Sequence, residues 1–298
     1  MTKTKAVIIL GPTGVGKSDL AIKIAKTFDG EIISADSVQI YKGLDIGSAK
    51  VMPNEMQGIV HHCIDILPAD AEFSVYEYVE LTKKLIREIT GRGHLPIIVG
   101  GMGLYIKALI EGYDFGGSGK NQAFRDELWT LSGEQLHERL MQLNPLRAQE
   151  ISPNDKKKLI RAIEIASFGI QPQSHGCCGI EFLTMAITLD RQLLYDRINK
   201  RVDIMISEGL ENEVKSLQNR GLTKENQSMK AIGYKEMLDY LSGQTTLEKA
   251  IELIKQHSRN YAKRQMTFLR GMKIKMFDKN DETAIMQYVR DFYDNNRN

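Results

Sequence analysis

The octapeptide Gly11-Pro-Thr-Gly-Val-Gly-Lys-Ser18 has the residue types and spacing of a phosphate-binding loop. Its glycines allow backbone N–H groups to turn inward around an anion at a helix N-terminus. Lys17 adds a positive charge, and the Ser18 hydroxyl can ligate Mg²⁺. An apolar run precedes the loop and an amphipathic stretch follows it, which is the order that the motif requires. We therefore predict that a di- or triphosphate binds to Gly11, Pro12, Thr13, Gly14, Val15, Gly16, Lys17 and Ser18.

The phosphate-binding loop (P-loop) alone does not reveal whether the phosphates are transferred, consumed or released. A kinase or ATPase is expected to hold magnesium with an acidic residue at the end of a central strand, but the run Leu95 to Val99 ends in Gly100-Gly101. Asp190 follows another apolar run, yet a helix is expected from the next residue, so we predict that Asp190 is an N-cap. This pattern argues against a P-loop kinase or NTPase, which stays an alternative hypothesis.

Asp36 is a second candidate for chemistry because it directly follows the apolar run Glu31 to Ala35. Open parallel sheets bind their ligands outside the carboxyl ends of the strands, which would place Asp36 beside the phosphates. The alternative interpretation is an aspartate that caps a helix or stabilises a loop.

Apolar runs alternate with helical patterns, which indicates a parallel sheet covered by helices. We expect strands at residues 5–10, 31–35, 95–99 and 183–189. Helices are expected at residues 19–28, 75–90, 122–143, 155–168, 191–217, 230–241 and 247–270.

The pattern changes after the Gly-Gly-Ser-Gly sequence that begins at Gly116, where two helical patterns stand without strands. We therefore predict an α/β fold with a P-loop NTPase-like parallel sheet. Its core would comprise residues 1–115 and 180–298, the latter ending in basic helices, and residues 116–179 would form an inserted helical subdomain.

Composition limits the possibilities only broadly. A chain of 298 residues, 42% of them hydrophobic, can bury a full core. The formal net charge is +2, so a nucleic-acid partner would have to bind a local basic surface. No basic and apolar leader and no apolar run of membrane-spanning length is present, so we expect a cytoplasmic protein without a membrane partner.

The cysteines and histidines do not show the paired ligand intervals of a zinc site. Three cysteines, two of them adjacent, agree with a reducing compartment. The residues that could supply zinc ligands by type are His61, His62, Cys63, His175, Cys177 and Cys178.

A basic segment lies near the C-terminal end and has no acidic residue before Asp278. Tyr261 and Phe268 are interleaved with its cations, and such a stripe can neutralise phosphates and stack unpaired bases. The alternative is a solvated helix face with both rings packed inward. The cations are Lys255, His257, Arg259, Lys263, Arg264, Arg270, Lys273 and Lys275.

Several strings together resemble the bacterial tRNA dimethylallyltransferases, members of the isopentenyltransferase family, in order and spacing. The resemblance covers nearly the whole chain. It rests on Gly11 to Ser18, Ile33 to Gly43, Asp45 to Lys50, Val99 to Tyr105, Asn154 to Ala162, Leu189 to Arg201, Ala231 to Glu236 and Lys263 to Arg270.

This resemblance implies transfer of a dimethylallyl group from its diphosphate to N6 of the adenosine 3′ of the anticodon, position 37 of tRNA. Adenine N6 loses a proton as it is alkylated, so a general base is needed, and the resemblance assigns that role to Asp36. Thr13, Lys17, Ser18 and Mg²⁺ would stabilise the leaving diphosphate. Arg201 would reach the same diphosphate, although by sequence alone it could equally be a solvated surface residue.

The resemblance also implies an extended contact with the anticodon stem-loop of tRNA, and we expect the protein to be a monomer. The implied tRNA-binding residues are Asp36, Ser37, Val38, Gln39, Met102, Lys157, Lys158, Leu159, Ile160, Arg161, Lys230, Ala231, Ile232, Gly233, Tyr234, Lys235, Lys263, Arg264, Gln265, Met266, Thr267, Phe268, Leu269 and Arg270.

Two departures from the family pattern keep other acceptors open. Met102 stands where the bacterial enzymes usually have a threonine, and the segment 171–179 lacks the usual threonine-glycine-lysine pattern. An adenylate isopentenyltransferase, which alkylates free AMP, ADP or ATP, is therefore an alternative, although the basic segment Lys263 to Arg270 argues against it.

Overall fold

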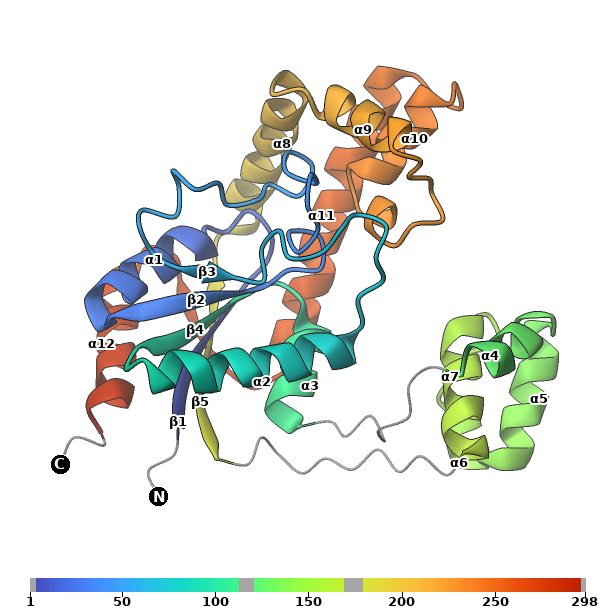
Figure 1. Ribbon diagram of the computed structural model, residues 1–298, viewed down its shortest axis with the longest axis horizontal. Helices are drawn as coiled ribbons and strands as arrows, with labels where there is room; N and C mark the ends of the chain where they lie inside the picture. Colours follow the sequence, from blue (N-terminus) through green and yellow to red (C-terminus); the bar gives the residue numbers. More distant parts are fainter. Residues whose placement is uncertain (1–3, 113–120, 169–178, 296–298) are drawn as a thin grey trace. The chain divides into compact units, whose positions relative to one another are not determined.

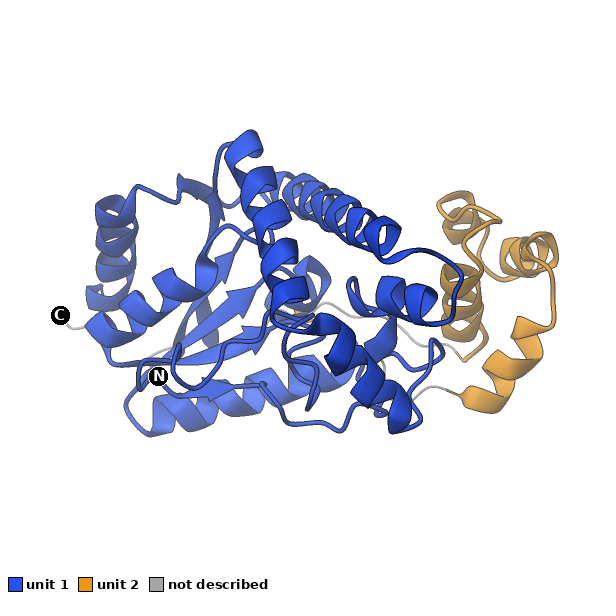
Figure 2. Ribbon diagram, turned by 90° about the horizontal axis from the view of Figure 1, so that it is seen from above, with its two compact units in different colours: residues 1–110, 179–298 blue, residues 111–178 orange. Residues whose placement is uncertain are grey.

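The computed structural model describes residues 4–112, 121–168 and 179–295. The chain divides into two compact units, residues 1–110 with 179–298 and residues 111–178 (Figure 2). The sequence pattern had placed the corresponding boundaries at residues 116 and 179. The predicted exit of the insert, residues 171–179, lies almost wholly outside the described residues.

The first unit is built on a parallel sheet, which confirms the predicted fold class (Figure 1). Within the described residues the sheet has six strands in the order β3-β2-β4-β1-β5-β6. The sequence pattern did not predict β3 and β6, which are short. The strands are β1 (Thr4–Leu10), β2 (Gly30–Ala35), β3 (His61–His62), β4 (Leu95–Gly100), β5 (Ile180–Thr188) and β6 (Lys275–Asp278).

Helices cover both faces of this sheet because neighbouring residues of a buried strand point to opposite faces. On β1, Ile8 packs in the cluster that includes α2 (Val75–Gly91) and α3 (Gly103–Glu111). Ile9 packs in the cluster that includes α1 (Lys17–Phe28) and α12 (Glu282–Asp294). The strands are therefore apolar throughout and not alternating, as expected for a doubly covered parallel sheet.

Two expected helices are each divided in two. The pattern 191–217 forms α8 (Arg191–Ser207) and α9 (Leu210–Asn219), because Gly209 has a φ of 97° that interrupts the helix. The pattern 122–143 forms α4 (Gln122–Trp129) and α5 (Gly133–Leu143), because Ser132 makes a capping box with Gln135. At the start of α8, the Asp190 carboxylate accepts hydrogen bonds from the N–H groups of Gln192 and Leu193, which confirms the predicted N-cap.

Further elements complete the first unit on the side of the loops that follow the strands. They are the 3₁₀ turn η1 (Ser228–Lys230), α10 (Tyr234–Leu241) and the long α11 (Leu247–Gly271). No helix within the described ranges combines the length and apolar character needed to cross a bilayer.

The second unit is a helical bundle with its own core. Leu136 and Leu140 of α5 pack against Leu159 and Ile163 of α7 (Lys156–Ser167), and α6 (Pro145–Gln149) joins α5 to the rest. At the edge of this core the buried Glu164 carboxylate accepts hydrogen bonds from Arg125 at 3.0 and 2.6 Å and from Arg161 at 2.6 Å.

The ends of the central strands are level. Gly100 of β4 lies in register with Leu10 of β1 on one side and with Ala35 of β2 on the other. The next residue on each strand is therefore Gly11, Gly101 or Asp36, and three loops leave one edge of the sheet together.

We expect Glu164→Gln to destabilise the helical unit by about 2 kcal/mol, because charge-assisted hydrogen bonds are weakened. Burial acts to raise the pKa of Glu164, but the hydrogen bonds from Arg125 and Arg161 outweigh it and hold the pKa below its ordinary value. The carboxylate therefore stabilises the fold fully above its unfolded-state pKa and loses that contribution as the pH falls through the lower folded-state pKa. The midpoint temperature of thermal unfolding, measured on the whole protein, should be higher for the wild type than for the variant near pH 7. The two temperatures should approach each other below about pH 4.

Glu127→Gln is the matched control, because Glu127 is an exposed carboxylate of the same unit that pairs with Arg139 at 3.3 Å. Exposed pairs contribute little, so this variant should unfold like the wild type. A Glu164→Gln difference that is as large at low pH as at neutral pH would contradict the electrostatic explanation.

Candidate active site

The P-loop connects β1 to α1 and closes on itself. Gly14 and Gly16 have φ values of 79° and 94°, a region that glycine enters without steric cost. At Gly11 an added Cβ would lie 2.8 Å from the backbone oxygen of Ile187, so a larger residue cannot fit against β5. The Lys17 ammonium donates to the backbone oxygen of Pro12 at 2.8 Å and thereby lies across the loop.

Lys17 shares this edge with Arg201 and Asp36. Burial lowers the pKa of Lys17 to about 8, the positive charge of Arg201 acts in the same direction, and Asp36 opposes them. Asp36 directly follows β2, whose last residue is in register with Gly100 of β4, and Arg201 contacts Thr13 of the P-loop, so all three groups lie at the carboxyl end of the sheet. The site is thus prepared for an anion that would restore the full charge of the lysine.

Arg201 reaches the site from α8. Its Nη1 lies 3.4 Å from the Thr13 hydroxyl, and one turn earlier Nη1 of Arg197 lies 3.5 Å from the backbone oxygen of Val15. Burial lowers the pKa of Arg201, although the negative charge of Asp36 opposes this shift. The structure thus brings the partly buried Arg201 to Thr13 and the P-loop.

Asp36 lies just beyond the end of β2 and is partly buried. Its Oδ1 accepts hydrogen bonds from the N–H groups of Val38 at 2.8 Å and Gln39 at 3.3 Å, which fixes the carboxylate on its loop. Tyrosines surround it: burial, with a contribution from the Asp36 charge, raises the pKa of both Tyr105 and Tyr261 to about 12. These phenols stay protonated and provide largely apolar walls.

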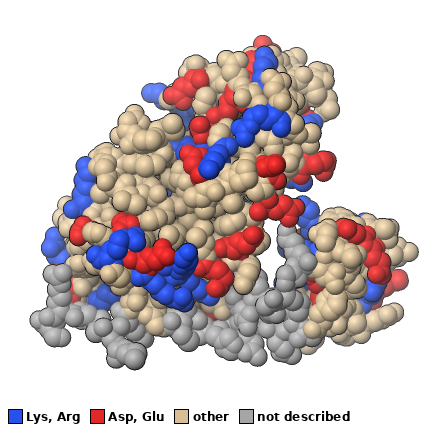
Figure 3. Space-filling view, viewed as in Figure 1, with Lys and Arg blue, Asp and Glu red and all other residues tan. Residues whose placement is uncertain are grey.

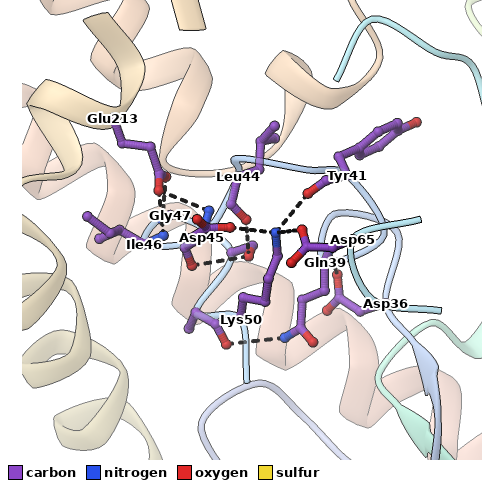
Figure 4. A network of polar contacts seen from close by, with 12 residues as sticks. Asp36, Gln39, Tyr41, Leu44, Asp45, Ile46, Gly47, Lys50, Asp65 and Glu213 are labelled. Carbon is purple, nitrogen blue, oxygen red and sulfur yellow. Dashed lines mark hydrogen bonds and ion pairs between the residues drawn. The ribbon is translucent and has the colours of Figure 1, made fainter. Parts of the chain in front are cut away.

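The loop after Asp36 is held by a polar network (Figure 4). The Glu213 carboxylate, on α9, accepts hydrogen bonds from the backbone N–H groups of Asp45, Ile46 and Gly47 at 2.7–3.1 Å and from the Tyr234 hydroxyl at 2.7 Å. No sequence pattern pointed to Glu213.

The Lys50 ammonium anchors the same loop from the other side. It is fully buried and donates to the backbone oxygen of Tyr41 at 2.8 Å, to Asp45 at 2.6 Å and to Asp65. Gln39 adds a hydrogen bond to the backbone oxygen of Ala49 at 3.2 Å. The segment that carries Asp36 is therefore a defined structure and not a free loop.

The glycines after β4 allow α11 to approach the site. An added Cβ at Gly101 would lie 2.0 Å from the Gln265 amide nitrogen, and one at Gly103 would lie 2.2 Å from the Phe268 ring. Met102 stands between them, and its sulfur accepts from the Tyr261 hydroxyl at 3.3 Å and the Ser37 hydroxyl at 3.6 Å. A weak thioether acceptor thus occupies the position where threonine was expected.

The residues implied as tRNA contacts divide by exposure. Those exposed to solvent are Lys157, Lys158, Lys230, Lys263, Arg264, Thr267 and Arg270. Those buried inside a unit are Leu159, Ile160, Gly233, Tyr234, Gln265 and Leu269. The remaining members, such as Arg161 and Lys235, are partly buried. The buried members can shape the surface but cannot form much of it.

On α11 a pocket of about 490 Å³ is lined by Asn260, Lys263, Arg264, Thr267 and Phe268. The Arg264 guanidinium lies 5.8 Å from the centre of the Tyr261 ring. On the face shown in Figure 3, Lys and Arg are mixed with Asp and Glu, in keeping with a net charge of only +2. A cationic pocket with an aromatic wall suits a nucleotide of a single-stranded loop.

A second hollow lies beside the P-loop, and sequence reasoning did not find it. It measures about 370 Å³, and Leu189, Leu193, Asp196, Arg197, Lys200, Lys279 and Asn280 line it. The Lys279 side chain covers Gly16, where an added Cβ would lie 3.0 Å from Cε. Lys279 follows β6, an element the sequence pattern had not predicted, so no signal pointed to it.

The donor set fits a phosphate-bound cation better than a metal held by protein alone. Among the described residues no three His, Cys, Asp or Glu side chains are grouped to hold a metal ion. Ser18 is exposed in the first turn of α1. Mg²⁺ usually keeps water ligands and uses few protein groups beside phosphate oxygens, which this arrangement allows.

Sequence and structure comparisons define the class of the protein. A profile described as IPP transferase matches residues 39–272, which is most of the chain. The chain therefore belongs to the IPP transferase family.

Individual relatives narrow this class. The chain is 46% identical to a tRNA dimethylallyltransferase of Geobacillus thermodenitrificans, over 97% of this chain and 95% of that one. The solved tRNA isopentenylpyrophosphate transferase of Bacillus halodurans is 41% identical and superimposes with a TM-score of 0.75, covering 97% and 96% of the two chains. A eukaryotic dimethylallyltransferase acting on tRNA is 28% identical, with a TM-score of 0.86 over 98% of this chain and 80% of that chain.

We expect the affinity for inorganic diphosphate to fall as the pH rises through about 8, because the partly buried Lys17 then loses the charge that binds the anion. Below that pH the lysine is protonated and the affinity should not depend on it. Above it the loss should approach tenfold for each pH unit. Calorimetric titration between pH 7 and 9.5 measures this dependence.

The reference for that titration is the Lys17→Arg variant, whose side chain stays charged over this pH range. Diphosphate itself changes protonation equally in both experiments, so its contribution cancels in the ratio of the two affinities. The ratio of wild-type to variant affinity should therefore be flat below pH 8 and decline above it. A ratio that is constant up to pH 9.5 would show that the lysine retains its ordinary pKa.

We expect Glu213→Gln to cost about 2 kcal/mol of stability, because backbone donors of the Asp45 to Gly47 turn would face an amide that accepts less well. Chemical denaturation of the variant measures this cost. Glu211→Gln on the same helix removes only a partly exposed pair with Lys215, and it should cost less than about 0.5 kcal/mol. Equal losses in both variants would mean that Glu213 does not anchor the loop.

Proposed function

We propose that this protein transfers a dimethylallyl group from dimethylallyl diphosphate to N6 of adenosine 37, next to the anticodon of a tRNA, and releases diphosphate. The observation that carries this conclusion is the meeting of the P-loop, Asp36 and Arg201 at one edge of the sheet. Membership of the IPP transferase family and the names of the relatives support the substrates.

In this reaction the adenine N6 forms a bond to the terminal carbon of the allylic group while the bond from that carbon to the diphosphate oxygen breaks. The proton leaves N6 and is taken up by a base. Asp36 suits this role because hydrogen bonds from Val38 and Gln39 to Oδ1 fix its position and one carboxylate oxygen suffices to accept a proton. The electron pair of the broken bond stays on the diphosphate.

The diphosphate gains negative charge as it leaves, and the cations of the site oppose that charge. Lys17 would exchange its hydrogen bond to Pro12 for one to the anion, and Arg201 lies with the Thr13 hydroxyl on the adjacent side. Mg²⁺ would be held by Ser18 and by oxygens of the diphosphate, and it would add charge neutralisation.

The RNA would bind over α11, where the exposed cations and the pocket beside Phe268 lie. The target adenosine must leave its stack to reach Asp36. Tyr261 of α11 contacts Met102, and Met102 contacts Ser37 of the Asp36 loop, so these residues connect that helix to the loop. The exposed Lys157 and Lys158 of the helical unit would add phosphate contacts. We place the protein in the cytoplasm, where tRNA is its substrate.

The alternatives are less well supported. Alkylation of free AMP would make no use of the cations along α11, and the named relatives act on tRNA. A kinase or NTPase is expected to hold magnesium with an acidic residue after a strand next to the P-loop strand β1. The two neighbours of β1 are β4, which ends in glycine, and β5, where the following Asp190 caps α8.

The test is incorporation of labelled dimethylallyl diphosphate into an anticodon stem-loop RNA, with free AMP present as a competing acceptor. We expect label in RNA and a loss of 10²- to 10⁴-fold in kcat for Asp36→Ala, because the general base is removed. Asp70→Ala, an exposed aspartate between β3 and α2, is the control and should retain full activity.

The distribution of label decides among the hypotheses. Label in AMP alone would support an adenylate isopentenyltransferase. Absence of label from both acceptors, together with phosphate release from ATP, would contradict prenyl transfer. Full activity of Asp36→Ala would leave the reaction standing and remove the proposed base.

A further inference from the structure

Gln265 lies buried at the junction of three segments of the first unit. Its Oε1 accepts a hydrogen bond from the backbone N–H of Thr13 at 2.9 Å, and its Nε2 donates to the backbone oxygen of Gly101 at 3.0 Å. Only 8% of the residue is exposed. A single side chain of α11 therefore joins the P-loop to the end of β4.

The resemblance had implied that Gln265 contacts tRNA, but both ends of its amide are occupied by backbone groups of the protein. Its neighbours Lys263, Arg264 and Thr267 are exposed, so the RNA-facing side of α11 is the opposite one. The Gln265 side chain therefore points toward the P-loop and the end of β4 and not toward solvent.

The contact with Thr13 matters because it commits one N–H group of the P-loop. In an ordinary phosphate-binding loop the backbone N–H groups point at the anion. Here the Thr13 N–H points at Gln265, and this fixes the backbone from which the Thr13 hydroxyl extends toward Arg201, 3.4 Å away. The hydroxyl and the guanidinium are thereby oriented together.

The glycine after β4 makes this arrangement possible. At Gly101 an added Cβ would lie 2.0 Å from the Gln265 nitrogen, so any larger residue would displace the amide. The position of the Gln265 amide therefore depends on the glycine at position 101.

We propose that Gln265 is a positioning residue: it holds Thr13, and through Thr13 the Arg201 guanidinium, in the orientation that stabilises the departing diphosphate. The kinetic effect that we expect rests on the proposed function. The hydrogen bond by which Gln265 holds Thr13 does not depend on it. Because α11 also carries the exposed cations, Gln265 ties the RNA-facing helix to the P-loop.

The kinetic test uses Gln265→Met, which conserves volume and removes both hydrogen bonds, and Gln265→Glu, which keeps the acceptor and loses the donor. With labelled dimethylallyl diphosphate and a stem-loop RNA, we expect kcat to fall about 10²-fold for Gln265→Met, as is typical when an oriented donor in an active site is lost. The KM for dimethylallyl diphosphate and the Kd for the RNA should stay within about threefold. Gln256→Met, on the exposed face of the same helix, should match the wild type.

A double-mutant cycle distinguishes positioning from a general loss of structure. If Gln265 acts through Thr13, Gln265→Met should lower the kcat of a Thr13→Val protein by less than about threefold, because the group that it orients is already absent. Multiplicative losses in the double variant would overturn the proposal. A higher Kd for RNA at unchanged kcat would also overturn it and would return Gln265 to the role of an RNA contact.

Hydrogen exchange of the Thr13 amide tests the geometry whatever reaction the protein catalyses. Protection of this amide should be lost in Gln265→Met, be retained in Gln256→Met and be partly retained in Gln265→Glu, which can still accept the hydrogen bond. Unchanged protection in Gln265→Met would overturn the proposal. If the wild type transfers no label to RNA, the proposed function fails, and the exchange measurement still decides whether Gln265 holds Thr13.

Discussion

The level ends of β1, β4 and β2 are the constraint on which the rest of the site depends. Since Gly100 pairs with Leu10 and with Ala35, the P-loop, the Gly101 turn and Asp36 leave the sheet at the same height. Parallel strands make this alignment possible, because all of their carboxyl ends lie at one edge. An acid, a cradle for phosphate and a helix that carries cations can then meet without any of them crossing the core.

The electrostatics of the site follow from that alignment. Lys17 and Arg201 are like charges in a partly buried place. Burial is the main cause that lowers the pKa of each, and the negative charge of Asp36 acts to raise both pKa values. Such a site has an unmet demand for negative charge that a diphosphate satisfies. The Glu213 and Lys50 contacts fix the loop that follows Asp36, and hydrogen bonds from Val38 and Gln39 hold the carboxylate itself.

The sequence predicted the local motifs well and the convergence of distant segments less well. The P-loop, the parallel sheet and the Asp190 cap were readable because each depends on neighbouring residues. The division at Gly209 was missed because apolar periodicity continues across it, although a glycine is a recognised signal. Glu213 and Lys279 could not be found, since nothing in a helix face or in a short edge strand reveals which loop it will contact. Arg201 was assigned by resemblance, and its place beside Thr13 became visible only in the fold.

The glycines that follow β4 carry a consequence for how such a chain can change over evolutionary time. A methyl group at position 100 would lie 2.1 Å from the Ala35 backbone oxygen, and methyl groups at positions 101 and 103 would meet Gln265 and Phe268. The steric clash at position 100 is with the backbone of Ala35, so no single substitution at another position can relieve it. The other two are with side chains of α11, so drift at positions 101 and 103 is open only to lineages that first accept a smaller residue at 265 or 268. Variation in this turn is therefore expected to be inherited in pairs, with the two halves of each pair more than 150 residues apart in the chain.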